Sequence, residues 1–201
     1  MIGWLYDLFS ARAERAGIGE LRRRLLADLE GDVLELGSGT GASLPYYERA
    51  RRLTAVEPDD SMAARLPRKI AEARVPIDVV TTRAEHMPFP DESYDAVVAA
   101  FMLCSVEDPA AVLAEARRVL RPGGKLVVLE HVLGEGRTAQ WQQRLTRLHA
   151  RMAGNCHLDR NTGETVAAAG FDTSRLERVR LPGTHALVRS GLQGVAIKTS
   201  S

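Results

Sequence analysis

Residues 33–41 read Val33-Leu34-Glu35-Leu36-Gly37-Ser38-Gly39-Thr40-Gly41, an aliphatic run that leads directly into three glycines at alternate positions. The aliphatic run predicts a buried strand over 32–36, and the glycines predict a sharp turn after it. Glycine lets the backbone turn without a Cβ clash and lets a ligand approach the main chain closely. In open α/β sheets, ligands bind beyond the carboxyl ends of the strands. The sequence therefore predicts a ligand-binding turn at residues 37–41.

Similar apolar runs recur along the chain and alternate with helical patterns, which is typical of a parallel sheet with crossover helices. Their nearly continuous hydrophobicity indicates burial on both faces. The predicted strands span residues 32–36, 52–57, 76–81, 94–100, 125–132, 176–181 and 187–198. A helix of about ten residues is predicted from Ala42, with others near 59–61 and over 109–120, 137–152 and 161–169. We expect an α/β fold with a doubly wound, mostly parallel, seven-stranded sheet and helices on both faces.

The composition is that of an ordinary globular protein, with 45% hydrophobic and 26% charged residues. The net charge of +1 creates no field that would attract nucleic acid, so we expect no nucleic-acid partner. Two cysteines are too few for a disulfide scaffold, and the start of the chain lacks the pattern of a secretory leader. We therefore expect a cytoplasmic location.

An acidic residue follows the second predicted strand. Glu57 lies 20 positions after Gly37, where a carboxylate can accept hydrogen bonds from both hydroxyls of a ribose. Glu35, two positions before the first glycine, can reach a cationic amine. The dinucleotide fingerprint of nicotinamide oxidoreductases remains an alternative, with Ala42 in the place of its third glycine. That alternative would require a negatively charged pyrophosphate to lie next to the negatively charged side chain of Glu35. A tight turn without any ligand is a further alternative.

Three segments carry a resemblance to a known family. Residues 33–41 resemble motif I of class I methyltransferases, and residues 84–95 are similar to the segment before strand four in the ubiquinone-type subgroup. Residues 118–124 resemble the helix and turn that precede strand five in the same family. Together they cover roughly residues 30 to 132 in matching order. The resemblance implies a Rossmann-like fold, S-adenosylmethionine as cofactor and S-adenosylhomocysteine as product.

A narrower likeness extends toward the carboxyl terminus. Residues 103–106, 129–132 and 155–160 are similar to alkyl-thiol methyltransferase-like proteins and their bacterial relatives. Bacterial phospholipid N-methyltransferases share much of the same pattern. The likeness implies a small-molecule or lipid-like acceptor, with a thiol, amine or hydroxyl as the methylated group.

Carried over position by position, the resemblance implies a set of cofactor-binding residues. Many relatives have aspartate where this chain has Arg83, so adenine recognition is expected to rely on backbone groups. The implied cofactor-binding residues are Tyr6, Glu35, Gly37, Ser38, Gly39, Gly41, Glu57, Pro58, Ala84, Glu85, Phe101 and Met102.

The length of 201 residues suggests a single domain over residues 1–201. Within it we expect a helical lid at 1–30, a cofactor-binding core at 31–133, and substrate-side helices and final strands at 134–201. The lid begins with Ile2, Trp4, Leu5, Leu8 and Phe9 on one helical face. Such a face packs across a site or makes weak peripheral contact with a membrane, and both alternatives remain open.

Methyl transfer is an in-line displacement that an enzyme accelerates by aligning the reactants and excluding water. The sequence shows no catalytic triad, so the catalytic residues are unknown. His131 and His157 are the candidates for substrate binding, although a structural role suits each equally well. Cys104 and Cys156 suggest a zinc site, but no second spaced pair accompanies them, and we expect no metal.

The sequence thus predicts an enzyme, an S-adenosylmethionine-dependent methyltransferase that acts on a small or lipid-like acceptor. A nicotinamide oxidoreductase and a non-catalytic S-adenosylmethionine-binding module are the alternatives. The oligomeric state is open.

Overall fold

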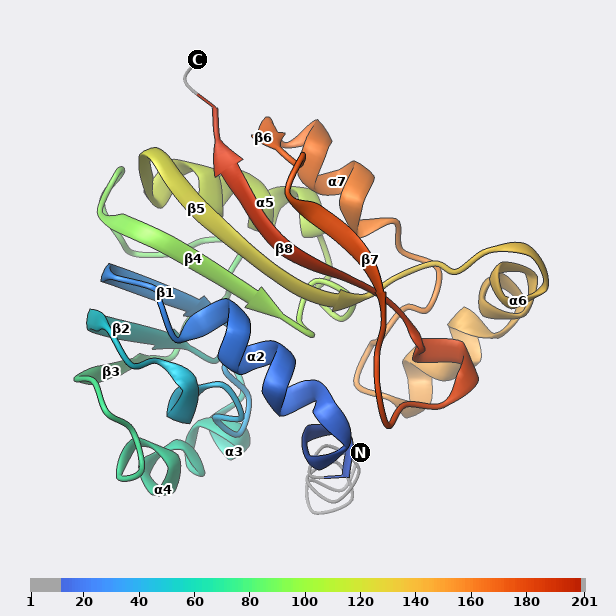
Figure 1. Ribbon diagram of the computed structural model, residues 1–201, viewed down its shortest axis with the longest axis horizontal. Helices are drawn as coiled ribbons and strands as arrows, with labels where there is room; N and C mark the ends of the chain where they lie inside the picture. The colour runs from blue at the N-terminus through green and yellow to red at the C-terminus, as the bar shows by residue number, and fades with distance from the viewer. Residues whose placement is uncertain (1–11, 200–201) are drawn as a thin grey trace.

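The sheet determines where the site lies. The computed structural model describes residues 12–199, and in this part of the chain eight strands form one sheet in the order β3-β2-β1-β4-β5-β8-β6, with β7 paired to β8 (Figure 1). Strands β1 to β5 run parallel to one another, whereas β8 runs antiparallel to β5, β6 and β7. The strands are β1 (Gly31–Leu36), β2 (Ala50–Val56), β3 (Ile77–Val80), β4 (Tyr94–Ala100), β5 (Leu120–His131), β6 (Phe171–Asp172), β7 (Leu176–Arg180) and β8 (Ser190–Lys198).

Helices cover both faces of the sheet, which confirms the predicted doubly wound α/β class (Figure 1). Successive residues of a strand point to opposite faces. Val97 of β4 therefore belongs to the hydrophobic cluster on the side of α5 and α7, while Val98 belongs to the cluster on the side of α2 and α4. The helices are η1 (Glu14–Ile18), α2 (Gly19–Leu26), η2 (Leu44–Tyr46), α3 (Asp60–Ala63), α4 (Leu66–Ile70), α5 (Pro109–Val119), α6 (Gly136–Met152), α7 (Thr162–Ala168) and η3 (Ala186–Val188).

The prediction of a helix of about ten residues from Ala42 is wrong. Only the three-residue η2 forms there, and Tyr47 is already extended, with φ −80° and ψ 115°. Pro45 fits the first turn of a helix but has no amide hydrogen to donate. Because β2 begins at Ala50, two residues earlier than predicted, little chain remains for a helix.

Several boundaries differ from the predictions, and the sheet has one more strand. Strand β8 begins at Ser190 rather than at residue 187, because residues 186–188 form η3. The sheet gains an eighth strand, the two-residue β6, where the sequence predicts seven strands. Strand β5 begins at Leu120, which pairs with Tyr94, rather than at Lys125. The register shifts between Tyr94 and Ala96, so the turn-forming residues 121–124 are accommodated within the strand.

The first part of the predicted lid, residues 1–11, lies outside the described residues, together with Tyr6 and the apolar face at 2–9. The described part of the lid contains η1 and α2. Arg22 of α2 is buried, and it donates to Glu14 at 2.8 Å and to Ser43 at 2.5 Å. Helix α2 is thereby tied to the loop that follows β1. Among the described helices, none has the length and apolarity needed to cross a membrane.

Candidate active site

The carboxyl ends of β1 to β5 meet at one edge of the sheet because these strands are parallel. Among the predicted cofactor residues that the structure describes, Glu35 lies near the end of β1 and the others follow β1, β2, β3 and β4 at this edge. His131 ends β5. The structure thus brings together segments that are up to about a hundred residues apart in the sequence. Their predicted roles remain predictions.

The glycine loop after β1 has the backbone conformation that the sequence predicts. Gly37, Gly39 and Gly41 have φ values of 62°, 57° and 83°, which residues other than glycine rarely adopt. A Cβ at Gly37 would lie 2.8 Å from the Cβ of Met102, so glycine is required for close packing there. At Gly39 the nearest atom to such a Cβ would be 4.0 Å away. The backbone at Gly39 is therefore open to a ligand.

Glu57 joins this loop to the end of β2. One carboxylate oxygen accepts the amide of Gly39 at 2.7 Å, and the other accepts the amide of Asp59 at 3.0 Å. The residue is only 5% exposed. Burial raises the pKa of the Glu57 carboxyl above its ordinary value, although the two amides act in the opposite direction. Glu57 is thus a preorganised acceptor within the predicted cofactor site.

Glu35 has partners within the protein. It is buried, and Tyr47 donates its hydroxyl to the carboxylate at 3.0 Å. Burial raises the pKa of Glu35, while Ser43, Arg22 and Tyr47 favour the charged form. The sequence did not single out Tyr47. It predicted Arg22 on a solvated helix face within the basic stretch 22–24, and this prediction is wrong for Arg22, which is buried. The predicted contact of Glu35 with the cofactor amine remains a prediction.

The residues at this edge fit S-adenosylmethionine. The hydroxyl of Ser38 is buried and has no hydrogen-bond partner among the described residues, so it is available to a polar ligand. Gly39 presents open backbone, and each oxygen of Glu57 can accept another donor. A polar adenosyl group with ribose hydroxyls matches this set of donors and acceptors.

The segment after β4 has a strained backbone, and a buried carboxylate accepts two of its amides. Phe101 has φ 58°, an unfavourable conformation for a non-glycine residue, and the guanidinium of Arg22 lies 5.3 Å from the centre of its ring. Buried Glu130 accepts the amides of Met102 and Leu103, both at 2.7 Å. Burial raises the pKa of Glu130 well above its ordinary value. No functional signal in the sequence points to Glu130 beyond its place in a family-like segment.

The predicted adenine side lies after β2 and β3. Ala84 is buried and Glu85 is half-buried, whereas Pro58 is exposed beside Glu57. Arg83, the departure from the family pattern, forms an ion pair with Glu107 at 2.9 Å. The structure therefore gives Arg83 an acidic partner on the surface.

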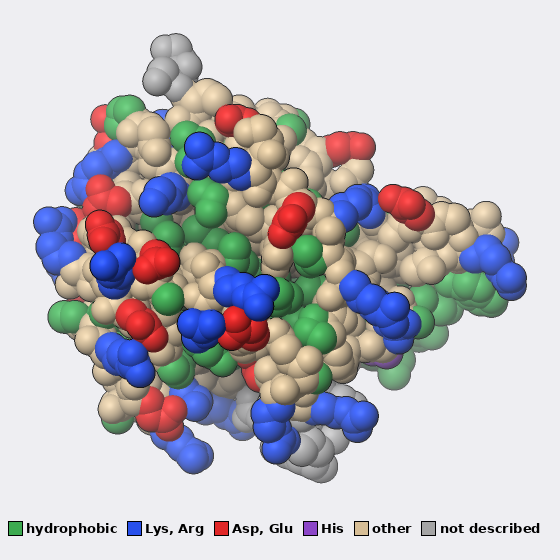
Figure 2. Space-filling view, viewed as in Figure 1, with side chains coloured by type: hydrophobic (Ala, Val, Ile, Leu, Met, Phe, Trp, Pro, Cys, Tyr) green, Lys and Arg blue, Asp and Glu red, His purple; other side chains and the backbone are tan. Residues whose placement is uncertain are grey.

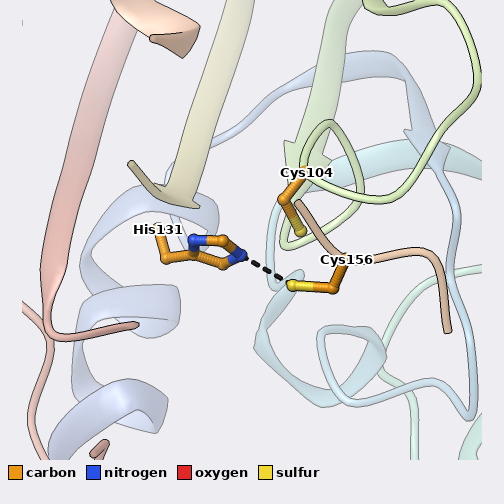
Figure 3. Close-up of side chains that lie close together, drawn as sticks. All are labelled: Cys104, His131 and Cys156. Atoms are coloured by element: carbon orange, nitrogen blue, oxygen red, sulfur yellow. Dashed lines mark hydrogen bonds between the residues drawn. The ribbon is translucent and has the colours of Figure 1, made fainter. Parts of the chain in front are cut away.

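At the other end of this edge, His131 meets two cysteines (Figure 3). Its Nε2 lies 2.9 Å from the Sγ of Cys156, and the potential ligand atoms of Cys104, His131 and Cys156 all lie within 4.8 Å of one another. We call these three residues the Cys–His cluster. Cys104 and His131 are buried and Cys156 is half-buried.

The ionisation of the Cys–His cluster is coupled. Hydrogen bonding to Cys156 and burial raise the pKa of the Cys104 thiol to about 12. Burial disfavours the charged form of His131, but Cys104 and Glu130 favour it more strongly, so the pKa of His131 lies above its ordinary value. His131 is thus a basic group at the predicted acceptor end of the edge.

The loop that carries Cys156 is fastened to the loop after β4. Arg160 donates to the carbonyl of Leu103 and, at 2.6 Å, to that of Val106. Asn155 donates to the carbonyl of Ser105 at 2.8 Å, and the amide of His157 donates to the carbonyl of Cys104 at 2.8 Å. These bonds hold Cys156 against Cys104.

His157, the second predicted substrate residue, lies next to the Cys–His cluster in sequence but outside it in space. Its ring lies 3.2 Å from the side-chain oxygen of Asn155. The sequence made His131 the first candidate for substrate binding and His157 the second, and the structure brings only His131 together with the sulfur atoms.

Comparison with known proteins identifies the class that this fold and site define. A family model described as a methyltransferase domain matches residues 34–128. Thiol S-methyltransferase TMT1A of Homo sapiens is 34% identical over 171 residues, which cover 83% of this chain and 70% of that protein. The chain therefore belongs to the class I S-adenosylmethionine-dependent methyltransferases. It is an enzyme that transfers the methyl group of S-adenosylmethionine to a small-molecule or lipid-like acceptor.

A second relative agrees with this assignment, and a solved structure shares the fold. Phosphatidylethanolamine N-methyltransferase of Cereibacter sphaeroides is 38% identical over 115 residues, covering 55% of this chain and 57% of that protein. An S-adenosylmethionine-dependent methyltransferase structure from Thermotoga maritima has a TM-score of 0.70 at 20% identity, covering 96% of this chain and 95% of that chain. The class assignment decides against the oxidoreductase and the non-catalytic module.

Proposed function

We propose that the protein methylates the sulfur of a small alkyl thiol. The observation that carries the proposal is the 34% identity to a thiol S-methyltransferase over 83% of this chain. The chemistry of the acceptor end supports it, because His131 lies there as a buried base. An amine or hydroxyl acceptor, as in the phospholipid methyltransferase relative, is the alternative.

The protein's own residues position the reactants. Bound S-adenosylmethionine supplies an electrophilic methyl group on a sulfonium. Glu57 and the buried hydroxyl of Ser38 hold the adenosyl part, and the strained segment at Phe101 and Met102 borders it. Glu130 fixes this segment through two backbone amides.

A thiol reacts as thiolate, and the free thiol pKa of about 8.5 leaves most of it protonated at neutral pH. The Nδ1 of His131 is buried without a hydrogen-bond partner among the described residues. When Nε2 donates to Cys156, Nδ1 is the free acceptor of the ring. We propose that Nδ1 of His131 accepts the proton that the acceptor thiol releases.

A competition assay tests the acceptor. Purified protein is incubated with methyl-labelled S-adenosylmethionine and an equimolar mixture of an alkyl thiol, a primary amine, a phenol and phosphatidylethanolamine. We expect labelled thioether and S-adenosylhomocysteine in equal amounts, lost in His131→Gln and kept in His86→Gln, an exposed histidine after β3. Label that enters the amine, phenol or phospholipid instead of the thiol refutes the proposal.

We also propose peripheral contact with an anionic membrane surface through α6. This helix buries polar Gln142 and Thr146 and exposes Trp141, Leu148 and Met152 by 50%, 57% and 69%. Figure 2 shows hydrophobic side chains gathered on this projecting part of the molecule, with Lys and Arg beside them. Residues 136–152 include no acid and four arginines, at positions 137, 144, 147 and 151. Apolar and cationic side chains together suit an anionic lipid interface.

Vesicle sedimentation tests this contact. We expect the protein to bind phosphatidylserine-containing vesicles more strongly than pure phosphatidylcholine, and the double variant Trp141→Ser, Leu148→Ser to lose binding. Gln143→Ser, an exposed change on the same helix, is the control. Equal binding by wild type and the double variant, or self-association through this face, refutes the proposal.

A cytoplasmic location is likewise a proposal. It is supported by the two free thiols of Cys104 and Cys156, which suit a reducing compartment. Fractionation of cells that express the tagged protein tests it. Recovery only from an oxidising compartment refutes it.

A further inference from the structure

Three metal-binding side chains reach one point from separate elements. Figure 3 shows Cys104 after β4, His131 at the end of β5 and Cys156 after α6, with their sulfur and nitrogen atoms directed toward one another. These atoms lie within 4.8 Å of one another. The cluster is outside the glycine loop and Glu57, and the family assignment gives it no role.

We propose that Cys104, His131 and Cys156 bind a zinc ion and leave its fourth position open for the sulfur of the acceptor. The sequence alone led us to expect no metal, because no second spaced pair of ligands accompanies the cysteines. The fold supplies the third ligand instead, from a strand end 25 residues before Cys156.

The spacing of the cluster suits zinc. Zn–S bonds of about 2.3 Å and Zn–N bonds of about 2.0 Å place tetrahedral ligand atoms about 3.5 to 3.8 Å apart. The 4.8 Å limit on the cluster and the 2.9 Å between His131 and Cys156 bracket these separations. Small side-chain rotations are therefore enough to surround an ion.

The charge balance also suits a dication. Two thiolates and a neutral imidazole neutralise Zn²⁺, so the buried centre carries no net charge. Three protein ligands with one open position are typical of catalytic rather than structural zinc sites. The half-buried position of Cys156 leaves a way in for the ion and the acceptor.

The ligand positions are held in place by the surrounding backbone. Arg160, Asn155 and the amide of His157 fasten the Cys156 loop to the carbonyls of residues 103–106. Glu130 fixes the same segment through the amides of Met102 and Leu103. A site with such support binds metal without rearranging the fold.

The consequence for catalysis rests on the proposed thiol acceptor. A thiol that coordinates zinc loses its proton to solvent, since coordination deprotonates thiols. Its sulfur then forms the new bond to the methyl carbon as the sulfonium bond to that carbon breaks, and the neutral thioether leaves the metal. In the metal-loaded protein, coordination to the ion keeps the acceptor thiol deprotonated, and His131 is a ligand instead of the base.

Cobalt spectroscopy tests the site without relying on activity. Reduced, metal-free protein is titrated with Co²⁺, which reports thiolate coordination through a charge-transfer band and tetrahedral geometry through intense visible bands. We expect one Co²⁺ per chain, displaced by one Zn²⁺. The bands are lost in Cys156→Ser and in His131→Gln, and kept in His86→Gln. Because Cys156 is half-buried, Cys156→Ser is expected to fold, and circular dichroism checks this.

Several results overturn the proposal. They are the absence of thiolate bands, bands that persist in Cys156→Ser, and a Cys104–Cys156 disulfide in protein isolated without oxidant. The site and the proposed function fail separately. Metal binding without thiol methylation refutes only the acceptor, whereas full thiol methylation by metal-free protein refutes only the role of zinc.

Discussion

The carboxylate of Glu57 accepts the backbone amide of Gly39 at 2.7 Å and so connects the end of β2 to the glycine loop after β1. Its other oxygen accepts the amide of Asp59. Each oxygen therefore has a fixed direction and a remaining lone pair before any ligand arrives. Such preorganisation lowers the cost of binding a ribose, because the acceptor does not have to be ordered first.

Removing the charge of Glu57 tests this arrangement. We expect Glu57→Gln to weaken S-adenosylmethionine binding by about 10- to 100-fold, since a hydrogen bond to a charged group contributes about 1.5 to 3 kcal/mol. The amide group of glutamine also turns a donor toward one of the two backbone amides. Isothermal titration calorimetry measures the effect, with the exposed Glu72→Gln as control. Unchanged affinity in Glu57→Gln contradicts the assignment.

Cofactor binding is expected to weaken as the pH falls, because Glu57 becomes protonated. The weakening begins at a higher pH than it would for a glutamate with an ordinary pKa. Burial raises the pKa of Glu57 above its ordinary value, so its carboxylate becomes protonated at a higher pH as the solution is acidified. The protonated group is a poorer acceptor for ribose hydroxyls, and affinity decreases through this pKa. Buried Glu35, whose pKa is also raised, adds to the decrease. Calorimetry across the pH range should show a smaller decrease in Glu57→Gln; identical profiles would count against the assignment.

Glu130 is expected to stabilise the segment after β4. In Glu130→Ala the buried amides of Met102 and Leu103 lose their acceptor, which costs about 2 to 5 kcal/mol in the free energy of unfolding. Glu130→Gln keeps an oxygen in the same place and should cost much less. Urea unfolding compares the two variants. Equal losses would show that the two amide bonds do not account for the stability.

Arg160 is expected to keep Cys104 inaccessible. Arg160→Met removes the bonds to the carbonyls of Leu103 and Val106, so the loops open more often and Cys104 reacts with a thiol reagent about tenfold faster or more. Peptide mass spectrometry distinguishes Cys104 from Cys156. Arg147→Met on the exposed side of α6 is the control. A rate at Cys104 equal to wild type would refute this role.

The strands of the cofactor half could be predicted because their signals are local. The aliphatic run before Gly37 and the turn-forming glycines place β1 and its loop within a few residues, and Glu57 follows from the next strand. The failed helix after Ala42 has a local cause as well. Pro45 and the early start of β2 outweigh helical periodicity in so short a connection.

The Cys–His cluster could not be predicted from periodicity. Cys104 and Cys156 meet because Arg160 bonds to the carbonyl of Leu103, which lies 57 residues away in the sequence. His131 joins them because β5 lies beside β4 in the sheet. These contacts depend on the assembled fold, whereas the sequence showed only that cysteine and histidine occur in family-like segments.

A crystal structure of the protein with S-adenosylhomocysteine tests the central claim most directly. We expect both ribose hydroxyls on the carboxylate of Glu57, the adenosyl group over Gly39, and the thioether sulfur facing the segment that leads from Phe101 to Cys104. A ligand bound elsewhere, or a Glu57 carboxylate that makes no contact with the ribose, would contradict the account.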